Sequence, residues 1–264
     1  MNAAVETRRL RKVFKDVVAV DGLDLQVEAG TVFGLLGSNG AGKSTTIKML
    51  VTLLPMTSGD ATVAGFDVRR RPRQVRAHIG YVPQLLSADA LTARENLNLS
   101  GALYGIPSGL RRRRIDDAFA LMDLASHADK TVRQFSGGMI RRLEVAQAML
   151  HRPAVLFLDE PTVGLDPSAR RVVWQRLTDL QTSLQTTIVL TTHDMEEAEA
   201  LCTRIAIMHG GRVAADGTPG TLKSALGPTA TLEDVFIKHT GGTLAEGGHY
   251  RDVASIRRTT SRLG

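Results

Sequence analysis

Short apolar runs alternate with longer amphipathic stretches along most of this chain. Four runs are typical of parallel strands buried on both faces: Thr31–Leu36, Ala154–Leu158, Thr187–Thr191 and Ile205–Met208. Helical patterns lie between them, from Lys43 to about Leu54, from Ser168 to about Leu184 with Pro167 in the first turn, and from Met195 to about Cys202. This alternation predicts an α/β fold with a parallel sheet.

Residues from about Leu85 to Leu150 follow a different pattern. They contain helical periodicity without a clear strand, and Thr92 with Glu95 three residues later forms a capping-box sequence at the start of one helix. We therefore expect a helical insertion in the α/β core.

Two further segments stand outside the strand–helix alternation. In Gly59–Asp67, Val63 lies between turn residues, which predicts a small antiparallel β piece. Thr231–His239 predicts a short helix capped by Thr231. The glycine pairs that follow, from residue 241 to 264, predict a loose tail.

The composition is that of a folded globular chain. Of 264 residues, 43% are hydrophobic and 23% charged, which argues against disorder over the whole length. The longest apolar runs are too short to cross a bilayer. The first twenty residues mix charged and apolar positions, so we expect no secretory signal. The single cysteine, Cys202, excludes a disulfide framework and suits a reducing cytosol.

Arginine dominates a basic charge balance. Lysine and arginine number 33 against 27 acidic residues, and arginines cluster at Arg69–Arg76 and Arg111–Arg114. Such clusters suit nucleic acid, anionic lipid or phosphate ligands, or simply a solvated surface. Aromatic residues make up only 4% of the chain, which argues against the stacking surfaces of single-strand binders.

A glycine-rich segment between a predicted strand and a predicted helix matches the P-loop pattern, Gly37-Ser-Asn-Gly-Ala-Gly-Lys-Ser44. Its glycines let backbone N–H groups approach a polyphosphate, and the following helix N-terminus favours negative charge. Lys43 can reach the β- and γ-phosphates, and the Ser44 hydroxyl can bind Mg²⁺.

Two carboxylates follow the predicted strand at Ala154–Leu158. Asp159 at the carboxyl end of the strand suits Mg²⁺, and Glu160 suits polarising an attacking water. A third segment, Phe135-Ser-Gly-Gly-Met139, precedes an amphipathic helix. Ser136 is expected to cap this helix, and the two glycines expose its first N–H groups as a second anion site.

Together these residues resemble the nucleotide-binding subunit of an ABC transporter, over about Thr7 to Gly242. Walker A would be Gly37–Ser44, Walker B Val155–Asp159, and the signature Ser136-Gly137-Gly138. Met139 stands where the wider family has glutamine, and Ser38 where it often has proline. The resemblance is strongest to ATPase subunits of the daunorubicin-resistance type of drug exporter, through Ser136–Met139, Arg141–Leu143, His151–Pro153 and Leu232–Phe236.

The resemblance implies specific roles in binding and hydrolysing ATP. Nucleotide-binding residues would be Phe14, stacked on adenine, Gly37, Ser38, Asn39, Gly40, Ala41, Gly42, Lys43, Ser44, Thr45, Ser136, Gly137, Gly138 and the D-loop residue Asp166. Catalysis would use Glu160, His193, Gln84 and Lys43, and Mg²⁺ would be held by Ser44, Gln84 and Asp159.

The same resemblance implies an architecture and partners. It predicts a P-loop NTPase core over residues 1–240, with a small antiparallel β subdomain and a helical subdomain of about residues 85–150, and a flexible tail at 241–264. Two copies would pair head to tail around two ATP molecules at the cytoplasmic face of the membrane. They would drive a separate permease, docked around Gln84 to Tyr104, that exports a drug or another hydrophobic compound.

One alternative is a soluble ABC ATPase that acts on nucleic acid or in complex assembly, without a permease. The arginine clusters permit it. However, the chain carries one nucleotide-binding unit and no coiled-coil or zinc-finger insertion of the kind found in DNA-repair members. Nucleic acid is therefore not the expected partner.

Overall fold

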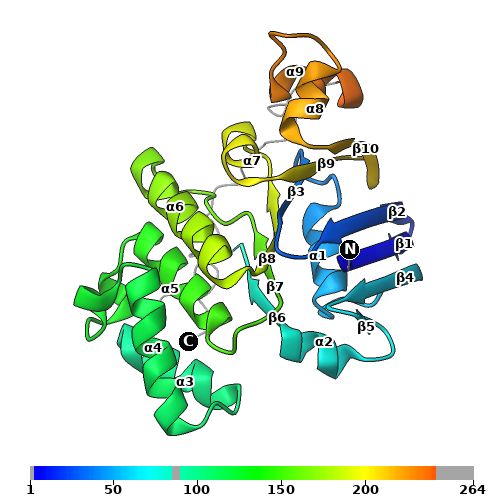
Figure 1. Cartoon of the computed structure of the whole chain (residues 1–264). Helices are drawn as coiled ribbons and strands as arrows, with labels where there is room; N and C mark the ends of the chain where they lie inside the picture. Colours follow the sequence, from blue (N-terminus) through cyan, green and yellow to red (C-terminus); the bar gives the residue numbers. More distant parts are fainter. Residues whose placement is uncertain (1–2, 85–89, 242–264) are drawn as a thin grey trace, which may run out of the picture.

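A six-stranded sheet runs through the middle of the fold in the order β10-β9-β3-β8-β7-β6 (Figure 1). Its strands are β3 (Val32–Gly37), β6 (Ile79–Val82), β7 (Val155–Asp159), β8 (Thr187–Thr192), β9 (Arg204–His209) and β10 (Arg212–Gly217). All neighbouring strands pair in parallel except β10, which is antiparallel to β9. The computed structural model describes residues 3–84 and 90–241. The buried strands predicted from sequence are confirmed to within one residue at each end.

A second sheet is antiparallel, in the order β2-β1-β4-β5. Its strands are β1 (Ala3–Phe14), β2 (Val17–Glu28), β4 (Ser58–Val63) and β5 (Phe66–Asp67). The small antiparallel piece predicted at Gly59–Asp67 is confirmed as β4 and β5. The two long strands β1 and β2 were not predicted, although Leu23, Leu25 and Val27 of β2 alternate with exposed polar residues; the pairing itself is interrupted by register shifts.

Helices flank the larger sheet on both sides. They are α1 (Lys43–Leu50), α2 (Pro72–His78), α3 (Ala93–Leu103), α4 (Ser108–Leu121), α5 (Gly137–Met149), α6 (Pro167–Leu184), α7 (Met195–Leu201), α8 (Pro219–Ser224) and α9 (Leu232–Thr240), with short 3₁₀ turns η1 (Ala125–His127) and η2 (Val132–Gln134). Within the described ranges, none of the helices combines the length and apolarity that crossing a membrane requires. Leu85 and residues 242–264 of the predicted tail lie outside those ranges.

Helix ends follow the predicted capping residues. Thr92 and Glu95 form a capping box at α3, and Ser136 accepts a hydrogen bond from the backbone N of Met139 at the start of α5. Thr231 caps α9 as predicted. The predicted extension of α1 to Leu54 is wrong, because Thr52 adopts a left-handed conformation (φ 66°) and the chain turns back onto the last carbonyls of the helix.

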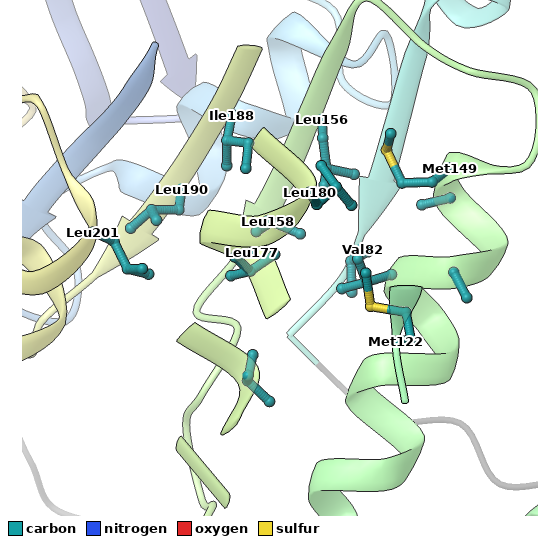
Figure 2. Close-up of a cluster of buried hydrophobic side chains, with 14 of the residues drawn as sticks. Val82, Met122, Met149, Leu156, Leu158, Leu177, Leu180, Ile188, Leu190 and Leu201 are labelled. Atoms are coloured by element: carbon teal, nitrogen blue, oxygen red, sulfur yellow. The ribbon is translucent and has the colours of Figure 1, made fainter. Parts of the chain in front are cut away.

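The larger sheet separates two apolar clusters, and strand periodicity decides which side each residue joins. On β7, Leu156 and Leu158 pack with α5 and α6, whereas Val155 and Phe157 face the layer of α1 and the antiparallel sheet. Figure 2 shows the first cluster, where Leu177 of α6 lies against the leucines of β7 and β8. Both faces of the parallel strands are thus covered, which leaves the ends of the strands as the accessible part of the sheet.

One close approach within this core allows a test of the packing. A Cβ atom on Gly80 of β6 would lie 2.5 Å from the carbonyl oxygen of Ala148 in α5. Gly80→Ala is therefore expected to lower the free energy of unfolding by about 1–3 kcal/mol, because β6 and α5 must move apart. Gly109→Ala in α4 is the matched control, since a Cβ there meets nothing within 4 Å. Urea denaturation of both variants measures the difference, and equal stabilities would contradict the packing.

Candidate nucleotide-binding and hydrolysis site

The loop from Gly37 to Ser44 joins the end of β3 to the start of α1. Gly40 and Gly42 have φ angles of 84° and 102°, which side chains rarely tolerate. At Gly42 a Cβ would also lie 2.5 Å from the carbonyl oxygen of Ala19 in β2. Gly42 is the N-cap of α1 and no side chain caps the helix. The first N–H groups of α1 are therefore available to an anionic ligand.

Lys43 folds back over this loop. Its Nζ donates hydrogen bonds to the carbonyl oxygens of Gly37 (2.8 Å) and Ser38 (3.1 Å) and lies 3.3 Å from Oε1 of Glu160. The residue is only 4% exposed. Burial is the largest influence on the pKa of Lys43 and lowers it, while the Glu160 carboxylate opposes that shift. The loop thus holds a buried ammonium group within reach of a phosphate.

Beside the loop, at the carboxyl ends of β7 and β8, two hydroxyl groups bind the carboxylate of Asp159. The Ser44 hydroxyl donates to Oδ1 of Asp159 at 2.8 Å, and the Thr191 hydroxyl donates to the same oxygen at 2.6 Å. Asp159 and Thr191 are register partners on adjacent parallel strands. These oxygen donors suit Mg²⁺, which typically takes one or two protein ligands and completes its shell with phosphate and water. No cluster of three or more histidine, cysteine or carboxylate side chains suited to a metal occurs in the described part of the chain.

Glu160 follows Asp159 in the sequence and adopts a backbone conformation that is uncommon for a non-glycine residue, with φ 49°. Its backbone N donates to the Thr191 hydroxyl at 2.9 Å, which holds the turn in place. Such strain clusters at functional sites, where the surrounding structure must enforce it. The turn directs the carboxylate back toward Lys43.

Three side chains surround the carboxylate of Glu160. They are Lys43, Gln84, whose Nε2 donates to Oε2 at 3.0 Å, and His193, whose Nδ1 lies 3.4 Å from Oε1. Burial would raise the pKa of Glu160, but His193 and Lys43 together outweigh it and lower the pKa. Glu160 in turn raises the pKa of His193, against the effect of burial. A carboxylate held ionised between such partners can orient and polarise a water molecule.

The other residues predicted for the site make their contacts elsewhere in the chain. Ser136 caps α5, and a Cβ on Gly138 would lie 3.0 Å from Cβ of Ala169 in α6. Asp166 accepts hydrogen bonds from Ser168 and Ala169 at the start of α6, which lower its pKa. Phe14 ends β1, 43% exposed, with Nζ of Lys12 4.9 Å from the centre of its ring. The structure therefore gathers Lys43, Ser44, Gln84, Asp159, Glu160 and His193, and leaves the signature segment on the α6 side.

Sequence reasoning missed two residues that support this cluster, Thr191 and Arg141, and a buried carboxylate on α7, Glu197. Thr191 bonds both Asp159 and Glu160, and its place after an apolar run is the same signal that identified Asp159. Buried Glu197 accepts hydrogen bonds from Thr162 and Trp174, and burial raises its pKa. Arg141 contacts the backbone at Gln84. Neither Glu197 nor Arg141 has a local signal, since charged residues in helices usually face water.

Comparisons with known proteins agree with this geometry. The family described as "ABC transporter" matches residues 20–163, more than half of the chain. The chain is 46% identical over 225 residues to the daunorubicin resistance ATP-binding protein DrrA2 of Streptomyces coeruleorubidus, covering 85% of this chain and 70% of that protein. It is 44% identical to the Nod factor export ATP-binding protein I of Cupriavidus pinatubonensis, covering 84% and 68% of the two chains.

Solved structures show the same fold. The ATP-binding subunit of an ABC transporter superposes with a TM-score of 0.78 at 28% identity, covering 89% of this chain and 98% of that one. CbiO1 of Clostridium perfringens, part of the ABC transporter complex cbiONQ, gives a TM-score of 0.79 at 26% identity, covering 85% and 92%. The expected P-loop core with a parallel sheet, an antiparallel sheet and added helices is thus confirmed, and the chain belongs to the ABC transporter family as an ATP-binding protein.

Proposed function

We propose that this chain is the ATP-hydrolysing subunit of an exporter and that it powers a separate membrane permease from the cytoplasmic face of the membrane. The observation that carries the proposal is the cluster at Glu160. There a glycine-rich loop, a buried lysine, a strained carboxylate, a glutamine and a histidine meet at one edge of the sheet. These groups can bind a polyphosphate and orient a water molecule for attack on its terminal phosphorus atom.

Binding of ATP is assigned to the loop and to the residues around it. The N–H groups from Gly37 to Thr45 surround the phosphates, and the Lys43 ammonium exchanges its contacts with Gly37, Ser38 and Glu160 for the β- and γ-phosphates. Phe14 offers an exposed aromatic ring for adenine. Ser44, Asp159 and Gln84 would hold Mg²⁺, which neutralises phosphate charge when bound.

Hydrolysis is assigned to the residues at the ends of β6, β7 and β8. Glu160 orients the attacking water and accepts its proton, and its lowered pKa keeps it ionised at neutral pH. His193 contacts the γ-phosphate and holds it in place, and Gln84 senses whether the γ-phosphate is bound. A tight turn at Glu160, fixed by Thr191, sets the direction from which the water approaches.

A second copy of the chain would complete each site. The N-terminus of α5 at Ser136–Gly138 makes its contacts at the start of α6, on the side of the sheet away from α1 (Figure 1). A head-to-tail pair would place this helix end and Asp166 of one copy over the ATP of the other. A second set of N–H donors then complements the γ-phosphate and excludes water from it.

We assign the docking site for the permease to the exposed face of α3. Leu103 is 81% exposed and Leu99 51% exposed, and Tyr104 extends the same apolar surface. Such a patch beside charged side chains is typical of a protein–protein contact. Similarity to drug-resistance proteins supports export of a drug or another hydrophobic compound.

The proposal is tested by copurification from native membranes. The tagged chain is solubilised gently with ATP and vanadate, and the proteins bound to it are identified. A stoichiometric polytopic membrane protein is the expected result. Recovery of the chain with nucleic acid or cytosolic proteins alone would contradict the proposal of a permease partner and favour a cytosolic ATPase.

A substitution on α3 makes this test specific. Leu103→Glu is expected to reduce recovery of the permease at least about 10-fold, because a buried unpaired carboxylate costs several kcal/mol at an interface. Leu53→Glu, on an equally apolar and 63% exposed residue beyond α1, is the matched control and should leave recovery unchanged. Quantitative mass spectrometry of the eluates measures both. Equal recoveries would move the docking surface away from α3.

A further inference from the structure

Arg141 is a charged residue with no solvent exposure at all. It lies in α5, five residues after the helix cap Ser136, and is the largest side chain that is fully buried in the described ranges. Burying a guanidinium is costly unless hydrogen bonds and a counter-charge compensate it. Burial is the largest influence on the pKa of Arg141 and lowers it. The position therefore needs an explanation beyond packing.

The guanidinium is bound to two consecutive backbone carbonyls. Nη1 donates to the oxygen of Pro83 at 2.7 Å, and Nη2 donates to the oxygen of Gln84 at 2.8 Å. Nη1 also lies 3.0 Å from Oε2 of Glu144, which supplies a counter-charge. The rigid planar fork of arginine matches two neighbouring acceptors in a way that an ammonium cannot.

The backbone held in this way carries Gln84, which reaches Glu160. β6 ends at Val82, so Pro83 and Gln84 lie beyond the pairing of the sheet. From there the Gln84 amide donates to Oε2 of Glu160 at 3.0 Å. A continuous series of hydrogen bonds thus runs from α5 through Arg141 and the backbone at Gln84 to the carboxylate.

We propose that Arg141 is a positioning residue for ATP hydrolysis: by holding the carbonyls of Pro83 and Gln84, it fixes the Gln84 side chain at Glu160. The inference rests on the hydrolytic roles proposed above for Gln84 and Glu160. Because α5 begins at Ser136, the same arginine also joins the helix assigned to the partner's ATP to the glutamine of its own site.

Arg142 provides a matched control on the same helix. Its Nη1 donates to the carbonyls of Met122 (2.8 Å) and Asp123 (3.0 Å), which follow α4. It therefore also binds two consecutive backbone carbonyls, through Nη1 alone, without touching Gln84. Replacing either arginine with lysine keeps the charge and removes the planar guanidinium.

The first experiment compares steady-state ATP hydrolysis of Arg141→Lys and Arg142→Lys. Arg141→Lys should lower kcat about 10-fold to 100-fold with little change in the KM for ATP, because misplacement of a group near the reacting atoms slows the chemical step. Arg142→Lys should keep the parent kcat. If both variants retain it, Arg141 has no positioning role. An inactive parent protein would instead contradict the proposed function.

A double-mutant cycle tests whether Arg141 affects hydrolysis through Gln84. In a Gln84→Ala background, Arg141→Lys should cause no further loss of kcat, because the residue that it positions is already gone. Independent losses that multiply would overturn the inference. If Arg141→Lys does not fold, the double variant Arg141→Met, Glu144→Leu takes its place, since apolar side chains that replace both partners of a buried ion pair often leave stability unchanged. Thermal unfolding of every variant verifies the fold.

Discussion

Replacing Lys43 with alanine is expected to weaken ATP binding at least about 100-fold, since charge-assisted hydrogen bonds contribute about 1.5–3 kcal/mol each. The lysine is buried over the glycine-rich loop, where no other lysine or arginine contacts Glu160 among the described residues. Without it, the Glu160 carboxylate faces the incoming γ-phosphate with one less compensating charge. Isothermal titration with ATP and Mg²⁺ measures the loss.

Lys48→Ala is the matched control for this variant. Lys48 occupies the last turn of the same helix and is exposed, so its removal should leave the affinity for ATP unchanged. Thermal unfolding verifies that Lys43→Ala remains folded although Glu160 has lost one partner. An affinity equal to that of the parent protein would remove the assignment of Gly37–Ser44 as a phosphate-binding loop.

Replacing Glu160 with glutamine is expected to lower kcat about 10²-fold to 10⁴-fold, the usual contribution of a general base. The amide has nearly the same shape but cannot accept a proton from water. Its neutral charge also removes repulsion from the γ-phosphate, so ATP should bind at least as well as in the parent protein. Single-turnover hydrolysis and ATP titration separate the two effects.

This variant should also accumulate as a dimer with ATP, because ATP that is not hydrolysed continues to join the two copies. Light scattering with and without ATP detects the change in mass. Glu28→Gln, at an exposed residue that ends β2, controls for the loss of a carboxylate. Hydrolysis by Glu160→Gln at the parent rate would show that another group activates the water. A monomer with ATP bound would contradict the head-to-tail pair.

Local sequence predicted the parts of the site that depend on short segments. The P-loop needs glycines at defined positions, and the φ angles of Gly40 and Gly42 show why side chains are excluded there. Asp159 was found because a polar residue that follows a buried parallel strand lies at the open edge of the sheet. The helix caps at Thr92, Ser136 and Thr231 were found for the same local reason, since capping hydrogen bonds span three residues.

The remaining part of the site depends on residues far apart in the sequence. Gln84 meets Glu160 across 76 positions, and Arg141 meets Gln84 across 57. The resemblance to ABC transporters pointed to Gln84 and His193, but no periodicity in the chain did so. The resemblance included Arg141 without assigning it a role, and only the packing of α5 against β6 reveals its burial.

The sequence by itself determined that this chain folds around buried parallel strands with a phosphate-binding loop and a carboxylate pair, because those features follow from hydrophobic periodicity and local backbone geometry. Only the tertiary structure decided the pairing of β1 with β2 and β4, the edge position of β6, and the contacts that converge on Glu160. Strand pairing and side-chain contact between distant segments depend on how the whole core packs, and packing has no signature within a short stretch of sequence.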